Sequence, residues 1–115
     1  MLSDEIQYRL LKLLHAEPHL SQRDVAQALK ISLGKANYCL KVFADRGWIE
    51  VDGFRDSGNR VTYRYLLTKS GLLQKTFITL QFLKRKQAEY KALQNELGDL
   101  QREIGSDRGG EDGLD

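Results

Sequence analysis

The stretch from 20 to 46 reads LSQRDVAQALKISLGKANYCLKVFADR and predicts two short helices joined by a tight turn. Ser21 is a good N-cap residue, and Asp24 three positions later can complete a capping box. Ser32 caps a second helix after a break of only a few residues, and Gly47 supplies its C-terminal stop. Two capped helices so close together indicate a helix-turn-helix.

The composition of the 115 residues indicates one small domain with an extension. A hydrophobic fraction of 41% and a charged fraction of 30% are typical of a soluble chain, and no apolar run is long enough to span a membrane. No signal peptide is visible, and a single cysteine excludes an internal disulfide framework. We therefore expect a cytoplasmic protein without a membrane partner.

The net charge of +2 is unevenly distributed along the chain. Residues 1–91 hold 16 Lys and Arg against 9 Asp and Glu, whereas residues 92–115 hold 2 against 7. Because attraction to phosphate depends on local charge, the basic body keeps nucleic acid open as a partner. The same split is compatible with an ordinary solvated surface, so charge alone does not decide the function.

Another helix is expected before this pair, beginning after its cap Ser3 and ending near residue 16, shortly before Pro18. His15, Glu17 and His19 cluster around the proline. The proline breaks the helix between the two histidines, and no third strong ligand lies nearby in the sequence. We therefore expect neither a metal site nor any other cofactor.

The second helix of the pair has an apolar and a polar face. Its apolar residues, which should pack on the other helices, are Ala36, Cys39, Leu40 and Phe43. The candidate DNA-contacting residues, on the cap and the opposite face, are Ser32, Gly34, Lys35, Asn37, Tyr38 and Lys41. Lysine and asparagine suit base edges in the major groove, glycine permits close backbone approach, and tyrosine can contact sugar, phosphate or a thymine methyl group. An ordinary polar helix face explains these residues equally well.

Two strand-like segments, 48–52 (WIEVD) and 61–67 (VTYRYLL), flank a polar loop that contains glycine. They predict a β-hairpin directly behind the helix-turn-helix, which is the position of a wing. Arg55, Arg60 and Arg64 of this hairpin can reach phosphates or a narrow minor groove. Any surface hairpin can carry arginines, so the order of three helices and a hairpin is the stronger indication.

The run ISLGKANYCLKVFADRGWIEV resembles the recognition helix and first wing strand of the MarR-type winged-helix transcription regulators. The run FRDSGNRVTYRYLLTKSG is similar to their wing and to the T-x-x-G opening of the next helix, and the resemblance covers about residues 3–75. It implies that Asp56 orients Arg60, which enters the minor groove. The chain length and the long terminal helix most resemble a short branch of that family associated with exopolysaccharide (EPS) gene clusters.

Two features depart from that family. The turn between the paired helices usually has glycine where this chain has Lys30, and a non-glycine residue in a left-handed conformation costs about 1 kcal/mol. Either the turn differs or the strain is tolerated. Longer members have additional helices around the dimer interface that often create a small-ligand pocket. This chain is too short to hold all of them, so a small-molecule effector is not expected.

Thr68 should cap a last helix that can run from residue 69 to about 104 without a proline, on the order of 50 Å. We expect its first apolar stripe to pack on the head, the winged helix-turn-helix part of the chain over residues 1–68. This stripe comprises Leu72, Leu73, Phe77, Leu80 and Leu83. Its second stripe has the alternating three-four spacing of a coiled coil and comprises Tyr90, Leu93, Leu97, Leu100 and Ile104. We expect the second stripe to pair with another subunit, and packing back on the head is the alternative.

The expected fold is mainly α with a small β-hairpin. It has a winged helix-turn-helix head over residues 1–68, a long C-terminal dimerisation helix over 69–104 and a disordered acidic tail over 105–115. The expected partners are double-stranded DNA and a second copy of the chain. A homodimer would place two recognition helices on a pseudo-palindromic site, with half-sites about 10 bp apart.

The expected function is sequence-specific regulation of transcription, and repression is favoured because no activating surface can be identified. The alternative is a winged-helix protein-interaction module with only non-specific DNA affinity. An enzyme is not expected, because Cys39 belongs to the packed face and no motif joins it to a base and an orienting group. Oxidant sensing through Cys39 is a minor alternative, since buried thiols are usually inert.

Overall fold

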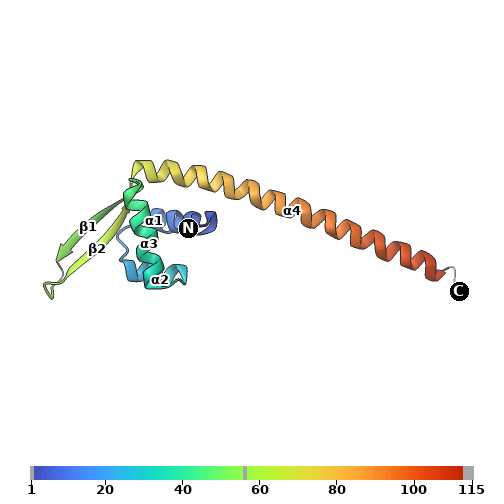
Figure 1. Ribbon diagram of the computed structural model, residues 1–115, viewed down its shortest axis with the longest axis horizontal. Coiled ribbons are helices and arrows are strands. Elements are labelled where there is room, and N and C mark those ends of the chain that lie inside the picture. The colour runs from blue at the N-terminus through green and yellow to red at the C-terminus, as the bar shows by residue number, and fades with distance from the viewer. Residues whose placement is uncertain (1, 56, 113–115) are drawn as a thin grey trace. The chain divides into compact units, whose positions relative to one another are not determined.

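The computed structural model describes residues 2–55 and 57–112, and Figure 1 shows the order of their elements. The elements are α1 (Asp4–Ala16), α2 (Gln22–Leu29), α3 (Leu33–Asp45), β1 (Ile49–Arg55), β2 (Val61–Leu67) and α4 (Lys69–Asp112). The chain divides into two compact units, residues 1–82 and 83–115. The predicted fold class is confirmed: three helices and a hairpin form a winged helix-turn-helix, and a long C-terminal helix follows.

The predicted N-caps determine where the first three helices begin. The Ser3 hydroxyl accepts a hydrogen bond from the Ile6 backbone N–H at 3.2 Å. Ser21 and Asp24 form a reciprocal capping box, because each side chain accepts from the backbone N–H of the other residue. Such caps satisfy backbone donors that the first helical turn leaves unpaired, and they depend only on neighbouring residues. Local sequence is therefore enough to predict these starts.

The tight turn of the helix-turn-helix is centred on Lys30, which adopts a left-handed conformation with φ 56° and ψ 46°. Its backbone N–H donates to the carbonyl groups of Ala26 and Gln27 and so closes α2. Arg9 adds a hydrogen bond from Nη2 to the Leu29 carbonyl at 3.0 Å. The chain therefore makes the usual turn and tolerates the strain of a non-glycine residue, a cost of about 1 kcal/mol.

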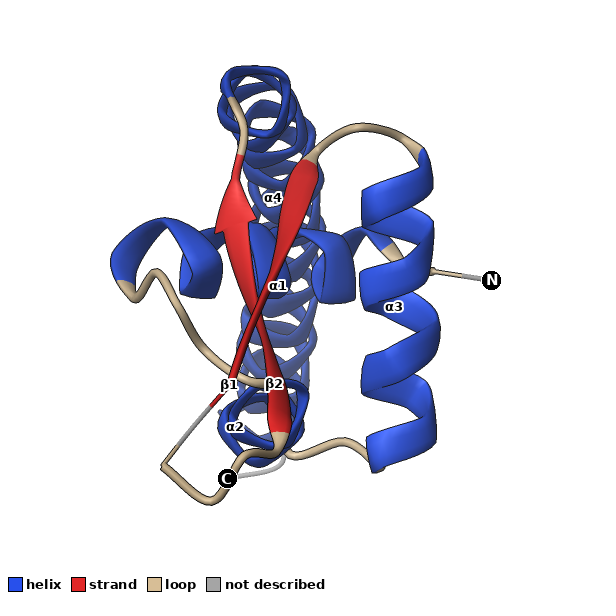
Figure 2. Cartoon of the chain, turned by 90° about the vertical axis from the view of Figure 1, so that its left-hand side faces the viewer, coloured by secondary structure: helices blue, strands red, loops and turns tan. Residues whose placement is uncertain are grey.

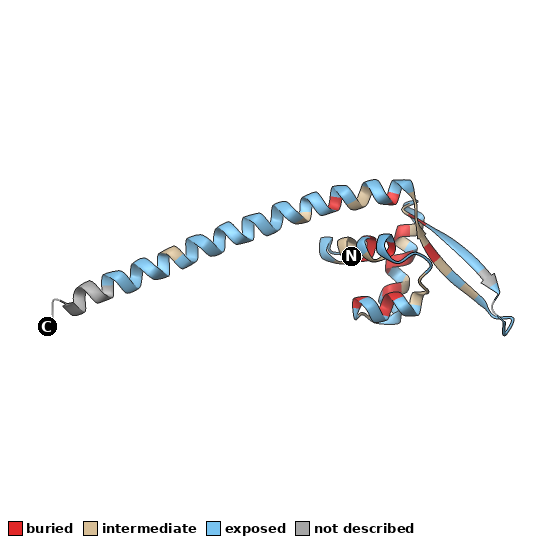
Figure 3. Cartoon of the chain, turned by 180° about the vertical axis from the view of Figure 1, so that it is seen from behind, coloured by how far each residue is buried: buried red, intermediate tan, exposed pale blue. Residues whose placement is uncertain are grey.

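The hydrophobic core lies where α1, α2 and α3 meet one another and the base of the hairpin. Its buried residues include Leu10, Leu11, Leu14, Val25, Leu29, Ala36, Cys39, Leu40, Phe43, Ile49 and Tyr65. Figure 3 shows buried segments in red in the three head helices and in the hairpin. Each buried leucine contributes about 1.5–3 kcal/mol relative to an exposed one. This burial fixes α3 against the head by its apolar face and leaves the other face outward.

The hairpin is antiparallel, and its register pairs Val51 with Tyr65 and Arg55 with Val61. Figure 2 shows the two strands as a narrow ribbon beside α3. The first strand continues to Arg55, beyond the predicted end at residue 52, because pairing with β2 supplies backbone hydrogen bonds that local sequence does not reveal. An isolated bridge between Leu20 and Tyr65 also ties the segment before α2 to the hairpin.

The start of α4 is tied to the end of the helix-turn-helix by Thr68 and Gly71. The Thr68 hydroxyl donates to the Gly47 carbonyl at 2.7 Å and accepts from the Gly71 backbone N–H at 3.0 Å. A Cβ atom on Gly71 would collide with the Trp48 carbonyl group. The predicted Thr68 cap is confirmed, and the T-x-x-G sequence has a direct structural reason.

The prediction that the first apolar stripe of α4 packs on the head is wrong. Within residues 69–82, the side chains that contact the head include Ile78, which is 4% exposed, and Phe82, which stacks on Tyr8 at 4.8 Å between ring centroids. Leu73 and Phe77, by contrast, are 74% and 54% exposed. The close approach of Gly71 to Trp48 selects the helix face that turns inward, and apolar content alone does not reveal this choice.

α4 ends at Asp112, whereas the sequence predicts an end near residue 104 and a disordered tail. Extending an existing helix adds one hydrogen bond per residue, and each glycine costs only about 1 kcal/mol, so residues 105–112 remain helical. The last three residues of the expected tail lie outside the described residues. None of the described helices is both long and apolar enough to cross a membrane.

Candidate nucleic-acid interface

The exposed face of α3 carries most of the residues that the sequence suggests for DNA contact. Lys35, Tyr38 and Lys41 are exposed, and Asn37 is partly buried. Gly34 has an ordinary backbone conformation, and an added Cβ atom would meet nothing within 4 Å. The protein itself therefore does not require glycine at this position, and the space before it is open.

Ser32 has a role within the protein, because its hydroxyl accepts a hydrogen bond from the Lys35 backbone N–H at 3.1 Å. This cap begins α3 at Leu33, and the other backbone N–H groups of a first helical turn have no carbonyl partner within the helix. Helix N-termini carry a partial positive charge that favours phosphate. The first turn of α3 is thus suited to an anionic partner.

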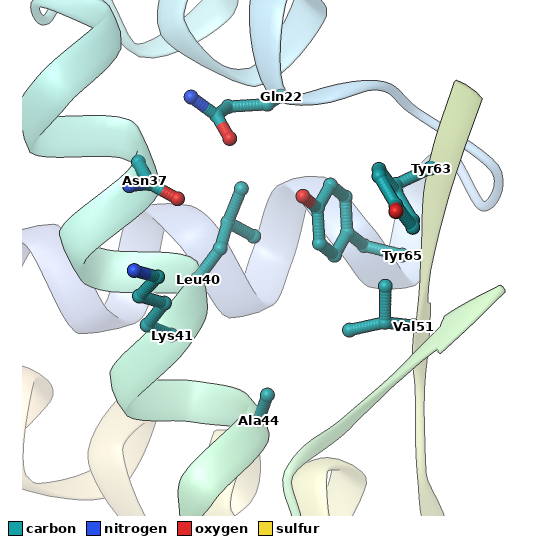
Figure 4. A pocket seen from close by; sticks show the side chains of 8 residues that line it. All are labelled: Gln22, Asn37, Leu40, Lys41, Ala44, Val51, Tyr63 and Tyr65. Atoms are coloured by element: carbon teal, nitrogen blue, oxygen red, sulfur yellow. The ribbon is translucent and has the colours of Figure 1, made fainter. Parts of the chain in front are cut away.

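A cavity of about 290 Å³ separates α3 from the hairpin. Figure 4 shows Asn37, Lys41 and Ala44 along α3 on one side of it, with Tyr63 and Tyr65 across from them. Burial, and then the nearby Tyr63, raise the pKa of the Tyr65 hydroxyl. Two of the candidate contact residues of α3, Asn37 and Lys41, therefore line the same cavity as residues of the wing.

A second hollow of about 260 Å³ lies between the hairpin and the start of the helix-turn-helix. Its lining comprises Ser21, Gln22, Arg23, Leu33, Val61, Thr62, Tyr63 and Tyr65. Gln22, Tyr63 and Tyr65 line both hollows, and Gln22 also donates from Nε2 to the Leu33 carbonyl at 3.3 Å. The wing therefore lies beside both α2 and α3.

The hairpin arginines do not all occupy one surface. In an antiparallel ribbon, paired residues project from the same face and neighbours alternate. Arg55 shares a face with its partner Val61 and with Tyr63, whereas Arg64 lies on the opposite face and is paired with Asp52. Arg60 is exposed and immediately precedes β2, and Asp56, its expected orienting residue, lies outside the described residues. The two strand arginines can thus reach different parts of a ligand.

Sequence reasoning missed Gln22, Leu33 and Tyr63 as residues of this surface. Leu33 is the first residue of α3 and is 47% exposed, while Tyr63 is 54% exposed. The alternation of Val61, Tyr63 and Tyr65 in the strand sequence was an available signal, since residues two apart share a face. The position of Gln22 depends on the packing of α2 against α3, which the sequence does not show directly.

Other chemically active side chains lie away from this surface or inside the core. Cys39 is fully buried, and burial raises the pKa of its thiol, although the charge of Lys35 opposes the shift. His15 contacts Lys75, with Nδ1 and Nζ 2.9 Å apart. Among the described residues, no group of three or more His, Cys, Asp or Glu side chains could hold a metal ion.

These features define the class of the head: it is a winged helix-turn-helix domain, in which α3 is the second helix of the pair and the hairpin is the wing. Residues 3–50 match the family model described as "Winged helix-turn-helix DNA-binding". No curated protein sequence matches the chain.

Solved structures of transcriptional regulators share this fold. A PadR-like regulator from Bacillus cereus has a TM-score of 0.68 at 17% identity, over 77% of this chain and 91% of that one. The PcaV regulator from Streptomyces coelicolor has a TM-score of 0.60 at 25% identity, over 90% of this chain and 78% of that one. MepR, a transcription regulator of the Staphylococcus aureus multidrug efflux pump MepA, has a TM-score of 0.57 at 20% identity, over 87% of this chain and 76% of that one.

Proposed function

We propose that this protein is a homodimeric regulator of transcription that binds a pseudo-palindromic site in double-stranded DNA and represses by occluding a promoter. The observation that carries the proposal is the outward face of α3, with Lys35, Asn37 and Lys41, directly beside a hairpin that carries Arg55, Arg60 and Arg64. In this fold a recognition helix enters the major groove and its N-terminal residues meet base edges. No catalytic activity is part of the proposal.

Within this proposal the contacts of the head divide into two kinds. Asn37 and Lys35 read bases, because an amide or ammonium group can pair with base edges in the major groove. Arg55, Arg60 and Arg64 of the wing meet phosphates or the adjacent minor groove, where arginine is favoured by negative potential. Base contacts give sequence preference, and phosphate contacts give affinity that depends on salt.

Variants of these residues test the assignment. Asn37→Ala should weaken binding to the preferred duplex by about 1–3 kcal/mol and leave binding to an unrelated duplex nearly unchanged. Arg60→Ala should weaken both duplexes and lower the slope of log affinity against log salt by about one. Equal losses for both variants on both duplexes would contradict the division into base and phosphate contacts.

The dimer part of the proposal rests on the part of α4 that belongs to the second unit, residues 83–112. Tyr90, Leu93, Leu97, Leu100 and Ile104 recur at three-four spacing, and each is between 49% and 63% exposed. A single polar helix with such a stripe gains little stability in water until another surface covers the stripe. A second copy of α4 covers it in register.

Equilibrium sedimentation of matched variants tests the dimer. Leu97→Glu places a charge in the proposed seam, so we expect dissociation to monomers at micromolar concentration. Asn95→Glu adds the same charge two residues away, on the opposite side of the helix, and should leave the dimer intact. A dimer that survives Leu97→Glu and truncation after Lys86 would exclude this stripe as the seam.

The finer family assignment is also a proposal: a short, cytoplasmic MarR-type regulator of the branch associated with exopolysaccharide gene clusters. It is supported by the runs that include α3, the wing and the T-x-x-G opening of α4, with Thr68 and Gly71 in the required contacts. The proposed orientation of Arg60 by Asp56 belongs to the same assignment.

A further inference from the structure

Leu33 occupies an unusual position for a leucine. It is the first residue of α3, immediately after the Ser32 cap, and its side chain is 47% exposed. The Gln22 amide donates to its carbonyl at 3.3 Å, which holds the start of the helix beside α2. Lys35 follows two positions later and is exposed. An apolar side chain thus projects from the helical turn that the proposed function directs toward base edges.

Leu33 has apolar neighbours from a different element. It lines the 260 Å³ hollow together with Val61 and Tyr63 of β2, which are 49% and 54% exposed. Arg23 lines the same hollow and contributes a positive charge. Three large apolar side chains therefore surround one open space that has a cationic group beside it. This combination suits an anionic partner that presents a small apolar group.

The major groove of DNA presents one such group, the C5-methyl of thymine. In the proposed function, α3 lies in that groove with its first residues toward the bases. We propose that Leu33 contacts a thymine methyl group in each half-site and thereby selects thymine at that position. The inference rests on the proposed function and adds an apolar contact to the polar readout by Lys35 and Asn37. A phosphate flanking the thymine would then meet Arg23.

Deoxyuridine provides a direct probe, because it replaces the methyl group with hydrogen and keeps the same base-pairing edge. Each thymine of the preferred duplex is replaced in turn, and binding by the full chain is titrated. We expect one thymine per half-site at which the replacement weakens binding about fourfold, the value for one buried methyl group. For Leu33→Ala we expect weaker binding to the thymine duplex and no further loss with deoxyuridine at that position.

Two variants control the measurement. Leu33→Met keeps an apolar side chain and should keep the sensitivity to deoxyuridine. Leu73→Ala shortens another exposed leucine, on α4, and should bind both duplexes as the unchanged protein does. Because Leu33 is half exposed, its replacement by alanine should leave the unfolding transition of the head nearly unchanged.

The outcomes separate this inference from the proposed function. If the protein prefers one sequence but Leu33→Ala keeps the full deoxyuridine effect at every thymine, the Leu33 contact is overturned and the proposed function stands. If replacement of thymine by deoxyuridine still weakens binding by Leu33→Ala but not by Tyr38→Ala, the methyl contact belongs to Tyr38 instead. Binding without any sequence preference in the unchanged protein would overturn both.

Discussion

Arg55 donates from Nη1 to Asn59 twice, to the side-chain oxygen at 3.2 Å and to the backbone carbonyl at 3.4 Å. Asn59 adopts a left-handed conformation with φ 63°, which asparagine tolerates better than most residues. The two hydrogen bonds hold the guanidinium group near the tip of the hairpin. Asn59 is therefore expected to position Arg55 for a phosphate contact without meeting DNA itself.

Replacing Asn59 by glycine separates positioning from charge. Asn59→Gly keeps the turn but removes the side-chain acceptor, so DNA affinity should fall severalfold while the salt slope stays unchanged. Arg55→Ala removes the charge and should lower the slope by about one. Salt titrations of the two variants check this difference, and an unchanged affinity in Asn59→Gly would argue against the positioning role.

The contact between Gly71 and Trp48 predicts a sharp difference between two glycines of α4. Gly71→Ala should destabilise the head by about 1–3 kcal/mol or more, because its Cβ atom collides with the Trp48 carbonyl group. Gly105→Ala meets nothing within 4 Å and should stabilise the helix by up to about 1 kcal/mol. Urea unfolding of both variants measures the effects. Similar free energies of unfolding for the two would contradict the close approach.

The left-handed Lys30 predicts a stabilising substitution. Lys30→Gly should raise the free energy of unfolding by up to about 1 kcal/mol, because glycine adopts this conformation without strain. The matched control is Gln27→Gly in the last turn of α2, which should lower it by about the same amount. Thermal unfolding with circular dichroism distinguishes the two directions. A destabilised Lys30→Gly would mean that the lysine side chain contributes more than the strain removes.

Burial of Cys39 predicts a loss of stability at alkaline pH. Because the folded state raises the pKa of this thiol above its ordinary value of 9.0, the unfolded state loses its proton first as the pH increases. Stability is then fully present below pH 9 and decreases above it, by at most about 1.4 kcal/mol per pH unit for one proton. Urea unfolding at pH 8 to 10 should show a smaller decrease for Cys39→Ala than for the unchanged chain. If the free energy of unfolding fell equally with pH in Cys39→Ala and in the unchanged chain, the Cys39 thiol would not be the group responsible.

Local interactions explain which parts of the fold could be predicted from sequence. Ser3, Ser21 and Ser32 cap helices through contacts three residues away, so their effects are visible in the sequence. The face of α4 that packs on the head depends instead on Gly71 approaching the distant Trp48. Apolar content favoured Leu73 and Phe77, and the structure buries Ile78.

The candidate interface likewise has residues that the sequence could predict and residues that it could not. Residues of one helix, such as Lys35 and Asn37, could be predicted because helical periodicity places them on one face. Leu33 could not, since its relevance depends on Tyr63 of the hairpin and on the packing of Gln22. The same limit applies to Arg55 and Arg64, whose opposite faces follow from strand register.

The most direct test of the proposed function is selection of bound duplexes from a random DNA pool by the purified protein at near-physiological salt. The proposal predicts a recovered pseudo-palindrome with half-sites about 10 bp apart, because two symmetric recognition helices meet successive major grooves. Enrichment without any common sequence would contradict sequence-specific regulation. It would favour a protein-interaction winged helix with only non-specific DNA affinity.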